Sequence, residues 1–190
     1  MNFTTLDRVV IVGSSGVGKT TAARVLAQRL GSAHIELDAL HWLPNWVSRP
    51  RDDFRSLVES AVKEERWVVD GNYAPVRDIV WPKATAIVWL NYSFATVFAQ
   101  VCRRTMRRVA TGETLYSGNQ ESLRMTFFSR ESILWWVLTT YHARRREYQQ
   151  LLQDPGWAAL TKLEFRNPAE CNRFLQSLGD PPITPSGFHR

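Results

Sequence analysis

One eight-residue stretch near the start of the chain, GSSGVGKT at residues 13–20, constrains the fold more than any other. It follows directly on the β-branched run VVIV at residues 9–12 and leads into an apolar-periodic stretch at residues 21–30. This order of strand, glycine-rich loop and helix lets successive backbone N–H groups surround phosphate oxygens at a helix N-terminus. A glycine-rich turn that binds nothing is the alternative, and the terminal Lys-Thr pair favours phosphate binding.

The loop predicts a site for ATP with Mg²⁺. The side chain of Lys19 can reach the terminal phosphates, and the hydroxyl of Thr20 can ligate the metal ion. The nucleotide-binding residues predicted from this stretch are Gly13, Ser14, Ser15, Gly16, Val17, Gly18, Lys19, Thr20 and Thr21.

Apolar strands alternate with amphipathic helical stretches along the rest of the chain. We expect strands at 9–12, 34–37, 67–69, 85–90 and 160–165, and helices at 19–30, 52–64, 94–109, 131–152 and 168–178. This alternation predicts an α/β fold with a five-stranded parallel sheet and helices on both faces. We expect one domain over residues 1–180, with a small lid inserted at about residues 110–130 and a flexible tail at 181–190.

Composition limits the class of partner. With 24 Lys and Arg against 18 Asp and Glu, the net charge of +6 suits a protein that handles nucleotide phosphates or nucleic acid, without choosing between them. Much of the excess is local, in arginine clusters at 103–104, 107–108 and 144–146. Cys102 and Cys171 lack metal-ligand spacing, and the longest apolar run is too short to span a bilayer. We therefore expect a cytoplasmic protein without a membrane partner, as a monomer or weak homodimer.

Carboxylates follow the second and third predicted strands, where ligands sit in parallel sheets. Asp38 could accept a proton from an acceptor hydroxyl or hold the acceptor in line, although capping the next turn is also open to it. Asp70 could orient Mg²⁺ through water, or be a buried acid that caps its neighbours. The acceptor-binding residues predicted around these positions are Asp38, His41, Trp42, Gly71, Asn72, Tyr73 and Arg77.

Arginines are the candidates for stabilising the transferred phosphoryl group. Near the end of the helix predicted at 94–109, after the fourth strand, two adjacent faces carry Arg103, Arg104, Arg107 and Arg108. Their planar guanidinium groups bind phosphate oxygens in pairs and keep their charge when desolvated. One face can point at the nucleotide while the other meets solvent, and for each arginine a simple surface role stays open. Arg124, Arg130 and the run at 144–146 are further candidates.

These motifs together resemble those of the adenylate-kinase-related group of small P-loop kinases. More closely, the chain is similar to bacterial proteins described as adenylate-kinase-like or as DNA topology-modulation proteins. The resemblance reaches about residue 178 and rests on GSSGVGKTT at 13–21, DALHW at 38–42, VVDGNY at 68–73, VWLN at 88–91, GNQE at 118–121 and FRNP at 165–168.

The resemblance implies an ATP-binding core, an acceptor region after the second strand and an arginine-bearing lid. Asp70, Gly71 and Arg77 take the approximate places of an Asp-Gly pair and of the arginine that holds an acceptor phosphate. Arg104 lies where these kinases have an arginine at the base of the lid, and Arg166 would border the adenine. Asn91 stands where an aspartate is common, and residues 41–46 differ from a nucleoside-monophosphate site, so specificity for AMP does not transfer.

The leading hypothesis is an ATP- and Mg²⁺-dependent kinase acting on a nucleoside, a nucleotide or a similar polar metabolite. Its predicted catalytic residues are Lys19, Asp38, Asp70, Arg77 and Arg104; Thr20 and Asp70 would organise the metal, and Arg104 and Arg108 would contact the nucleotide. The alternative is an ATP-binding regulatory or DNA-associated protein, although the sequence has no recognisable helix-turn-helix or basic arm. A third hypothesis, ATP hydrolysis without an acceptor, conflicts with a closing lid that excludes water.

Overall fold

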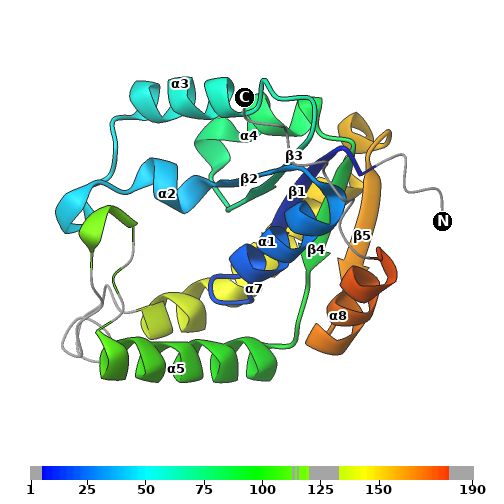
Figure 1. The fold of residues 1–190 in the computed structure, drawn as a ribbon. Helices are drawn as coiled ribbons and strands as arrows, with labels where there is room; N and C mark the ends of the chain where they lie inside the picture. The colour runs from blue at the N-terminus through cyan, green and yellow to red at the C-terminus, as the bar shows by residue number, and fades with distance from the viewer. Residues whose placement is uncertain (1–5, 113, 115, 120–132, 180–190) are drawn as a thin grey trace, which may run out of the picture.

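Five parallel strands form the centre of the computed structural model, which describes residues 6–112, 114, 116–119 and 133–179 (Figure 1). The strands are β1 (Arg8–Gly13), β2 (Ala33–Glu36), β3 (Trp67–Asp70), β4 (Ala86–Leu90) and β5 (Thr161–Phe165). Their order is β2-β3-β1-β4-β5, so the strand that leads into the phosphate loop lies between β3 and β4. The predicted α/β fold is confirmed, and each predicted strand end lies within one residue of the observed one.

Five longer helices accompany the sheet: α1 (Lys19–Leu30), α3 (Arg51–Ala61), α5 (Phe94–Thr111), α7 (Ile133–Gln153) and α8 (Pro168–Ser177). α3 ends earlier than predicted because Val62 leaves helical geometry and is buried in the core. Asn167 caps α8, since its Oδ1 accepts the backbone N–H of Glu170 at 3.0 Å. The start of the helix predicted at 131–152, most of the lid predicted at 110–130 and the tail at 181–190 lie outside the described residues.

Short helical segments connect the strands to the longer helices and carry most of the candidate acceptor residues. They are α2 (Leu37–His41), α4 (Arg77–Val80), and the 3-10 turns η2 (Pro44–Trp46), η3 (Ala74–Val76), η4 (Trp81–Lys83), η5 (Tyr116–Gly118) and η6 (Pro155–Trp157). In Figure 1, η5 lies next to the α2–η2 segment, and residues of η2 and η5 are in contact.

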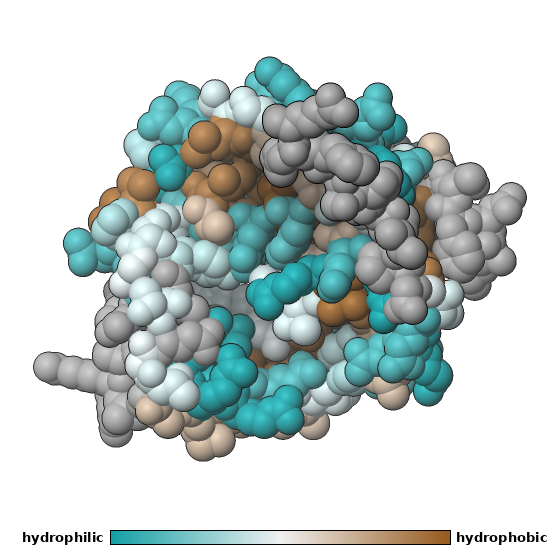
Figure 2. All heavy atoms as spheres, viewed as in Figure 1, coloured by the Kyte–Doolittle hydropathy of each residue, from teal (hydrophilic) through white to brown (hydrophobic). Residues whose placement is uncertain are grey.

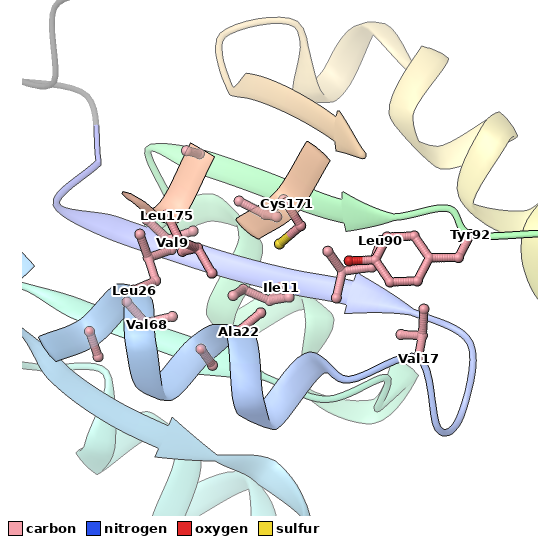
Figure 3. Close-up of a cluster of buried hydrophobic side chains, with 14 of the residues drawn as sticks. Val9, Ile11, Val17, Ala22, Leu26, Val68, Leu90, Tyr92, Cys171 and Leu175 are labelled. Carbon is pink, nitrogen blue, oxygen red and sulfur yellow. The ribbon is translucent and has the colours of Figure 1, made fainter. Parts of the chain in front are cut away.

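Successive residues of the central strands face opposite sides of the sheet, so each side has its own core. On one side, Val9 and Ile11 of β1 pack with Leu26 of α1 and Leu175 of α8 (Figure 3). On the other side, Val10 and Val12 pack with residues of α3 and α4 and with Tyr148 of α7. Figure 2 shows the exterior of the molecule from the same side as Figure 1. Hydrophilic residues cover much of the face in view, and a hydrophobic area lies around α2 and α3.

Two observations bear on the solution chemistry of the chain. Cys102 is partly exposed and Cys171 is buried, and both are free cysteines. Within the described part of the chain, every helix is too short or too polar to cross a bilayer.

Candidate phosphate and acceptor site

The phosphate loop connects β1 to α1 in the arrangement that the sequence predicts. Gly18 takes the left-handed conformation (φ 98°) and begins α1, so the loop backbone opens onto the N-terminus of that helix. The ammonium group of Lys19 donates to the carbonyl oxygens of Gly13 and Ser14, at 3.1 Å each. Both carbonyls belong to the loop itself, which keeps the ammonium group above the space that the loop encloses.

The charges around Lys19 define what meets at this loop. Burial lowers the pKa of Lys19, the carboxylates of Asp38 and Asp70 act against that shift, and Arg104 and Arg144 add to it. Asp38 has the largest effect of these charged groups. Lys19 therefore lies among carboxylates from the ends of β2 and β3 and guanidinium groups from α5 and α7.

Two loop glycines differ in what surrounds them, which gives a paired stability test. A Cβ on Gly16 (φ 78°) would overlap Cγ2 of the buried Val101, whereas a Cβ on Gly18 (φ 98°) would have no atom of the described residues within 4 Å. In both alanine variants the left-handed backbone conformation lowers the free energy of unfolding by about 1–2 kcal/mol. Gly16→Ala adds an overpacking cost, so we expect about 2–4 kcal/mol from it and about half of that from Gly18→Ala.

Urea unfolding of the two alanine variants without nucleotide measures this difference. Equal losses from the two variants would contradict the contact with Val101. Partial recovery of Gly16→Ala by a second change, Val101→Ala, would support it.

Thr20 lies between two carboxylates, at the point where a metal ion would bind beside the phosphates. Its hydroxyl oxygen is 2.7 Å from Oδ2 of Asp70 and 3.1 Å from Oε1 of Glu36. Asp70 is buried (3% exposed), and its other oxygen, Oδ1, is 2.9 Å from Nε2 of His34. Thr20 and Asp70 are brought together as predicted. Glu36 was not predicted, although its place at the end of β2, next to β3, could have indicated it.

The acceptor side of the site is built on α2 and on the residues that follow β3. The hydroxyl of Tyr73 donates to Oδ1 of Asp38 at 2.6 Å, and burial raises the pKa of Tyr73, so the hydroxyl keeps its proton. Burial also lowers the pKa of His41, whose ring lies 4.6 Å from the ring of Tyr73 and 5.0 Å from that of Phe54. Trp42 continues this cluster, so predicted acceptor residues also serve to pack α2 against α3.

The guanidinium group of Arg77 is held by a carboxylate of α7 that no sequence motif indicates. Its Nη2 is 2.7 Å from Oε1 of Glu147, and Nη1 of Arg144 is 2.9 Å from Oε2 of the same group. Burial alone would raise the pKa of Glu147, but the hydrogen bonds of the two arginines outweigh it and the pKa lies below its usual range. The guanidinium of Arg77 also lies over the ring of Trp81, 5.3 Å from its centre. Arg144, a lesser candidate in the sequence, thus joins Arg77 in the site.

Gly71 and Asn72 have structural neighbours other than an acceptor. The close approach that Gly71 permits (φ 140°) is to Leu37, whose Cβ would lie 2.7 Å from an added Cβ. The amide nitrogen of Asn72 donates to the carbonyl oxygen of Gly13, and its amide oxygen accepts the hydroxyl of Tyr148 at 2.7 Å. Asn72 thus contacts the phosphate loop.

The described part of the lid is bound to the segment that follows α2. The hydroxyl of Ser117 donates to the carbonyl oxygen of Trp42 at 2.7 Å. The buried side chain of Asn119 donates to the carbonyl of Leu43 and accepts the N–H of Trp46, at 3.0 Å each. The hydroxyl of Tyr116 donates to Glu36. Lid and acceptor segment are therefore in contact directly beside the two carboxylates that flank Thr20.

The remaining predicted residues divide between the site and the surface. Arg104 and Arg108 are half-buried on α5, whereas Arg103 and Arg107 are exposed, which matches the predicted division of the helix into two faces. Arg166 is exposed and pairs with Glu164 at 3.2 Å. Asn91 is buried and donates to Glu164 at 2.8 Å, so it joins β4 to β5.

Comparison with known proteins agrees with this geometry. The sequence profile of the family described as "ATPase family associated with various cellular activities (AAA)" matches residues 9–73, which include the phosphate loop and Asp70 and leave out the lid. No curated protein sequence gives a significant match.

Solved structures match most of the chain. A gluconokinase from Sinorhizobium meliloti 1021 is 21% identical, with 92% of this chain and 91% of that chain covered and a TM-score of 0.51. Shikimate kinase from Acinetobacter baumannii, in complex with shikimate, is 18% identical, with 93% and 92% covered and a TM-score of 0.55. Shikimate kinase from Bacteroides thetaiotaomicron is 16% identical, with 90% and 95% covered and a TM-score of 0.50.

The chain therefore has the α/β P-loop fold that small-molecule kinases also adopt. At these identities the likeness concerns the fold.

Proposed function

We propose that this protein is a Mg²⁺- and ATP-dependent kinase that transfers the γ-phosphoryl group to a hydroxyl group of a small polar metabolite, such as a nucleoside, a nucleotide or a hydroxy acid. One observation carries the proposal: the hydroxyl of Thr20, at the end of the phosphate loop, lies 2.7 Å from Oδ2 of Asp70 and 3.1 Å from Oε1 of Glu36. The loop that would hold the terminal phosphate thus meets carboxylates from the ends of β2 and β3, the strands that the acceptor segments follow. Phosphoryl transfer needs the acceptor and this phosphate in line at such a point.

The nucleotide would lie along the phosphate loop. Backbone N–H groups of residues 13–20 would surround the β-phosphate, and the ammonium of Lys19 would leave the carbonyls of Gly13 and Ser14 for the γ-phosphate. Arg104 would add positive charge from α5, in keeping with its effect on Lys19. Arg166 and Arg108 remain candidates for contacts farther along the nucleotide.

The residues around Thr20 suit a magnesium ion. The carboxylates of Asp70 and Glu36 each lie within hydrogen-bond distance of the Thr20 hydroxyl, and Mg²⁺ prefers such oxygen ligands. Among the described residues, no group of three or more histidine, cysteine or acidic side chains could hold a metal unaided, so the phosphates would complete the site. The ion would neutralise charge on the β- and γ-phosphates.

The bond formed, the bond broken and the proton released in the transfer can all be assigned. The acceptor hydroxyl oxygen would form a bond to the γ-phosphorus as the bond to the bridging oxygen of ADP breaks, and Asp38 would take the hydroxyl proton. Tyr73 holds Asp38 in place through its 2.6 Å hydrogen bond. Arg77 and Arg144 would balance charge on the transferred group, with Glu147 fixing both guanidinium groups.

The test is a screen of acceptors in the presence of Mg²⁺ and ATP. ADP release would be followed with nucleosides, nucleoside monophosphates, gluconate, shikimate and related hydroxy acids, and thermal shifts with a non-hydrolysable ATP analogue would detect binding. We expect ADP release that depends on one class of acceptor. ATP binding with no acceptor response, together with DNA binding that weakens steeply with salt, would instead establish the regulatory hypothesis.

A further inference from the structure

We infer that Tyr148, acting through Asn72, is a positioning residue for the phosphate loop, and that it favours the loop conformation that binds the triphosphate. The inference rests on the proposed nucleotide binding at residues 13–20. It assigns a role to a buried tyrosine of α7 that lies far from the loop in sequence and is connected to it through Asn72.

The hydrogen bonds fix the direction of this connection. The carbonyl of Gly13 can only accept, so the amide nitrogen of Asn72 must face it, and the amide oxygen of Asn72 must face Tyr148. The hydroxyl of Tyr148 is therefore the donor, at 2.7 Å. Burial raises the pKa of Tyr148, which keeps that proton in place. Without the hydroxyl, the bond to the Gly13 carbonyl alone orients the amide, and the amide oxygen loses its donor.

Gly13 is where the position of the loop is set. Its φ of 150° suits glycine, and an added Cβ would lie 2.7 Å from the carbonyl oxygen of Leu90 on β4. The first residue of the loop is thus packed tightly against the neighbouring strand. The direction of its carbonyl affects how the next N–H groups are aimed at phosphate.

The contribution of Asn72 differs between the empty and the nucleotide-bound protein. In the empty protein the Gly13 carbonyl accepts from both Asn72 and Lys19, the latter at 3.1 Å. When Lys19 turns to the phosphate, Asn72 is left as the side-chain donor to that carbonyl. Loss of the Asn72 bond therefore costs more in the bound state, which weakens nucleotide binding more than it lowers the stability of the empty protein.

One turn of α7 brings three side chains to the site. Arg144 and Glu147 pair with each other at 2.9 Å, and Glu147 holds Arg77, while Tyr148 reaches Asn72. α7 is the helix that follows the lid in sequence. The Tyr148–Asn72 contact therefore links the helix after the lid to the first residue of the phosphate loop.

The experiment measures binding of Mg²⁺ with a non-hydrolysable ATP analogue by calorimetry. Tyr148→Phe should raise the Kd by about threefold to tenfold, the worth of one neutral hydrogen bond. Asn72→Ala should have at least the same effect, and adding Tyr148→Phe to it should change the Kd little, because both act through one contact. Tyr141→Phe is the matched control: Tyr141 is also buried on α7, and its hydroxyl donates to the Tyr92 carbonyl at 2.7 Å rather than to Asn72.

The outcomes separate this inference from the proposed function. If the wild-type protein binds the analogue and Tyr148→Phe binds it equally well, the inference is overturned and the proposed function stands. If the wild-type protein fails to bind the analogue, the proposed function is overturned and the inference with it. Should Tyr148→Phe lower the Tm more than Tyr141→Phe does, Asn72→Asp replaces it, since a carboxylate at position 72 cannot donate to Gly13 yet can still accept from Tyr148.

Discussion

Lys19→Met is expected to abolish phosphoryl transfer, with kcat lower by at least about 10²–10³-fold, because it removes a preorganised positive charge from the terminal phosphate. Methionine keeps most of the volume of the lysine side chain, so the loop between β1 and α1 should keep its packing. ADP release with the best acceptor from the screen measures the effect. Lys63→Met, at an exposed position after α3, is the matched control and should retain full activity.

The same variant has a defined effect on stability. Burial lowers the pKa of Lys19 below its usual value, so between the two pKa values the unfolded chain binds more protons and stability rises with pH. Below its lowered pKa, Lys19 carries the full cost of the buried charge. Lys19→Met removes that cost together with the two hydrogen bonds to the Gly13 and Ser14 carbonyls, so the Tm of the empty protein should change little and should depend less on pH in the alkaline range. Unchanged kinase activity in this variant would remove the basis of the proposed function.

Asp38→Asn is expected to lower kcat by about 10²–10⁴-fold, the usual contribution of a general base. The amide still accepts the hydroxyl of Tyr73, so the local structure should persist. Binding of MgATP should not weaken, because the change removes a negative charge close to Lys19. A fall in kcat with unweakened nucleotide binding would distinguish an acceptor-side base from a residue that holds the nucleotide.

Single-turnover kinetics with saturating acceptor and a fluorescent nucleotide titration measure these two quantities. Asp53→Asn, an exposed aspartate in the first turn of α3, controls for the loss of one negative charge. A kcat within about tenfold of wild type would argue against proton transfer to Asp38.

The fold was predictable because local signals agreed with one another. β-branched runs such as residues 9–12 are buried on both faces of a parallel sheet, so they read as continuous apolar strands. Asn167 and Pro168 mark the start of α8 by capping chemistry that acts within one turn. Short helices such as α2 and α4 were not predicted, because tertiary contacts rather than repeated apolar spacing stabilise elements of four or five residues.

The site was predictable where residues follow strands and unpredictable where helices meet them. Thr20 was predicted from the phosphate-loop motif, and Asp38 and Asp70 were predicted because the carboxyl ends of parallel strands share one edge of a sheet. Glu147 and Tyr148 lie on a long helix whose sequence shows only that some face is buried. Their partners, Arg77 and Asn72, are 70 and 76 residues away in the chain, and no local pattern reports such a pairing.

The contacts between the lid and the segment after α2 have a consequence for altering this protein. Ser117 and Asn119 reach only main-chain atoms of Trp42, Leu43 and Trp46. A substitution of those three side chains leaves each acceptor carbonyl and the donor N–H in place. Substitutions at these three positions can therefore change the side chains of the segment after α2 while the hydrogen bonds from residues 117 and 119 keep their main-chain partners.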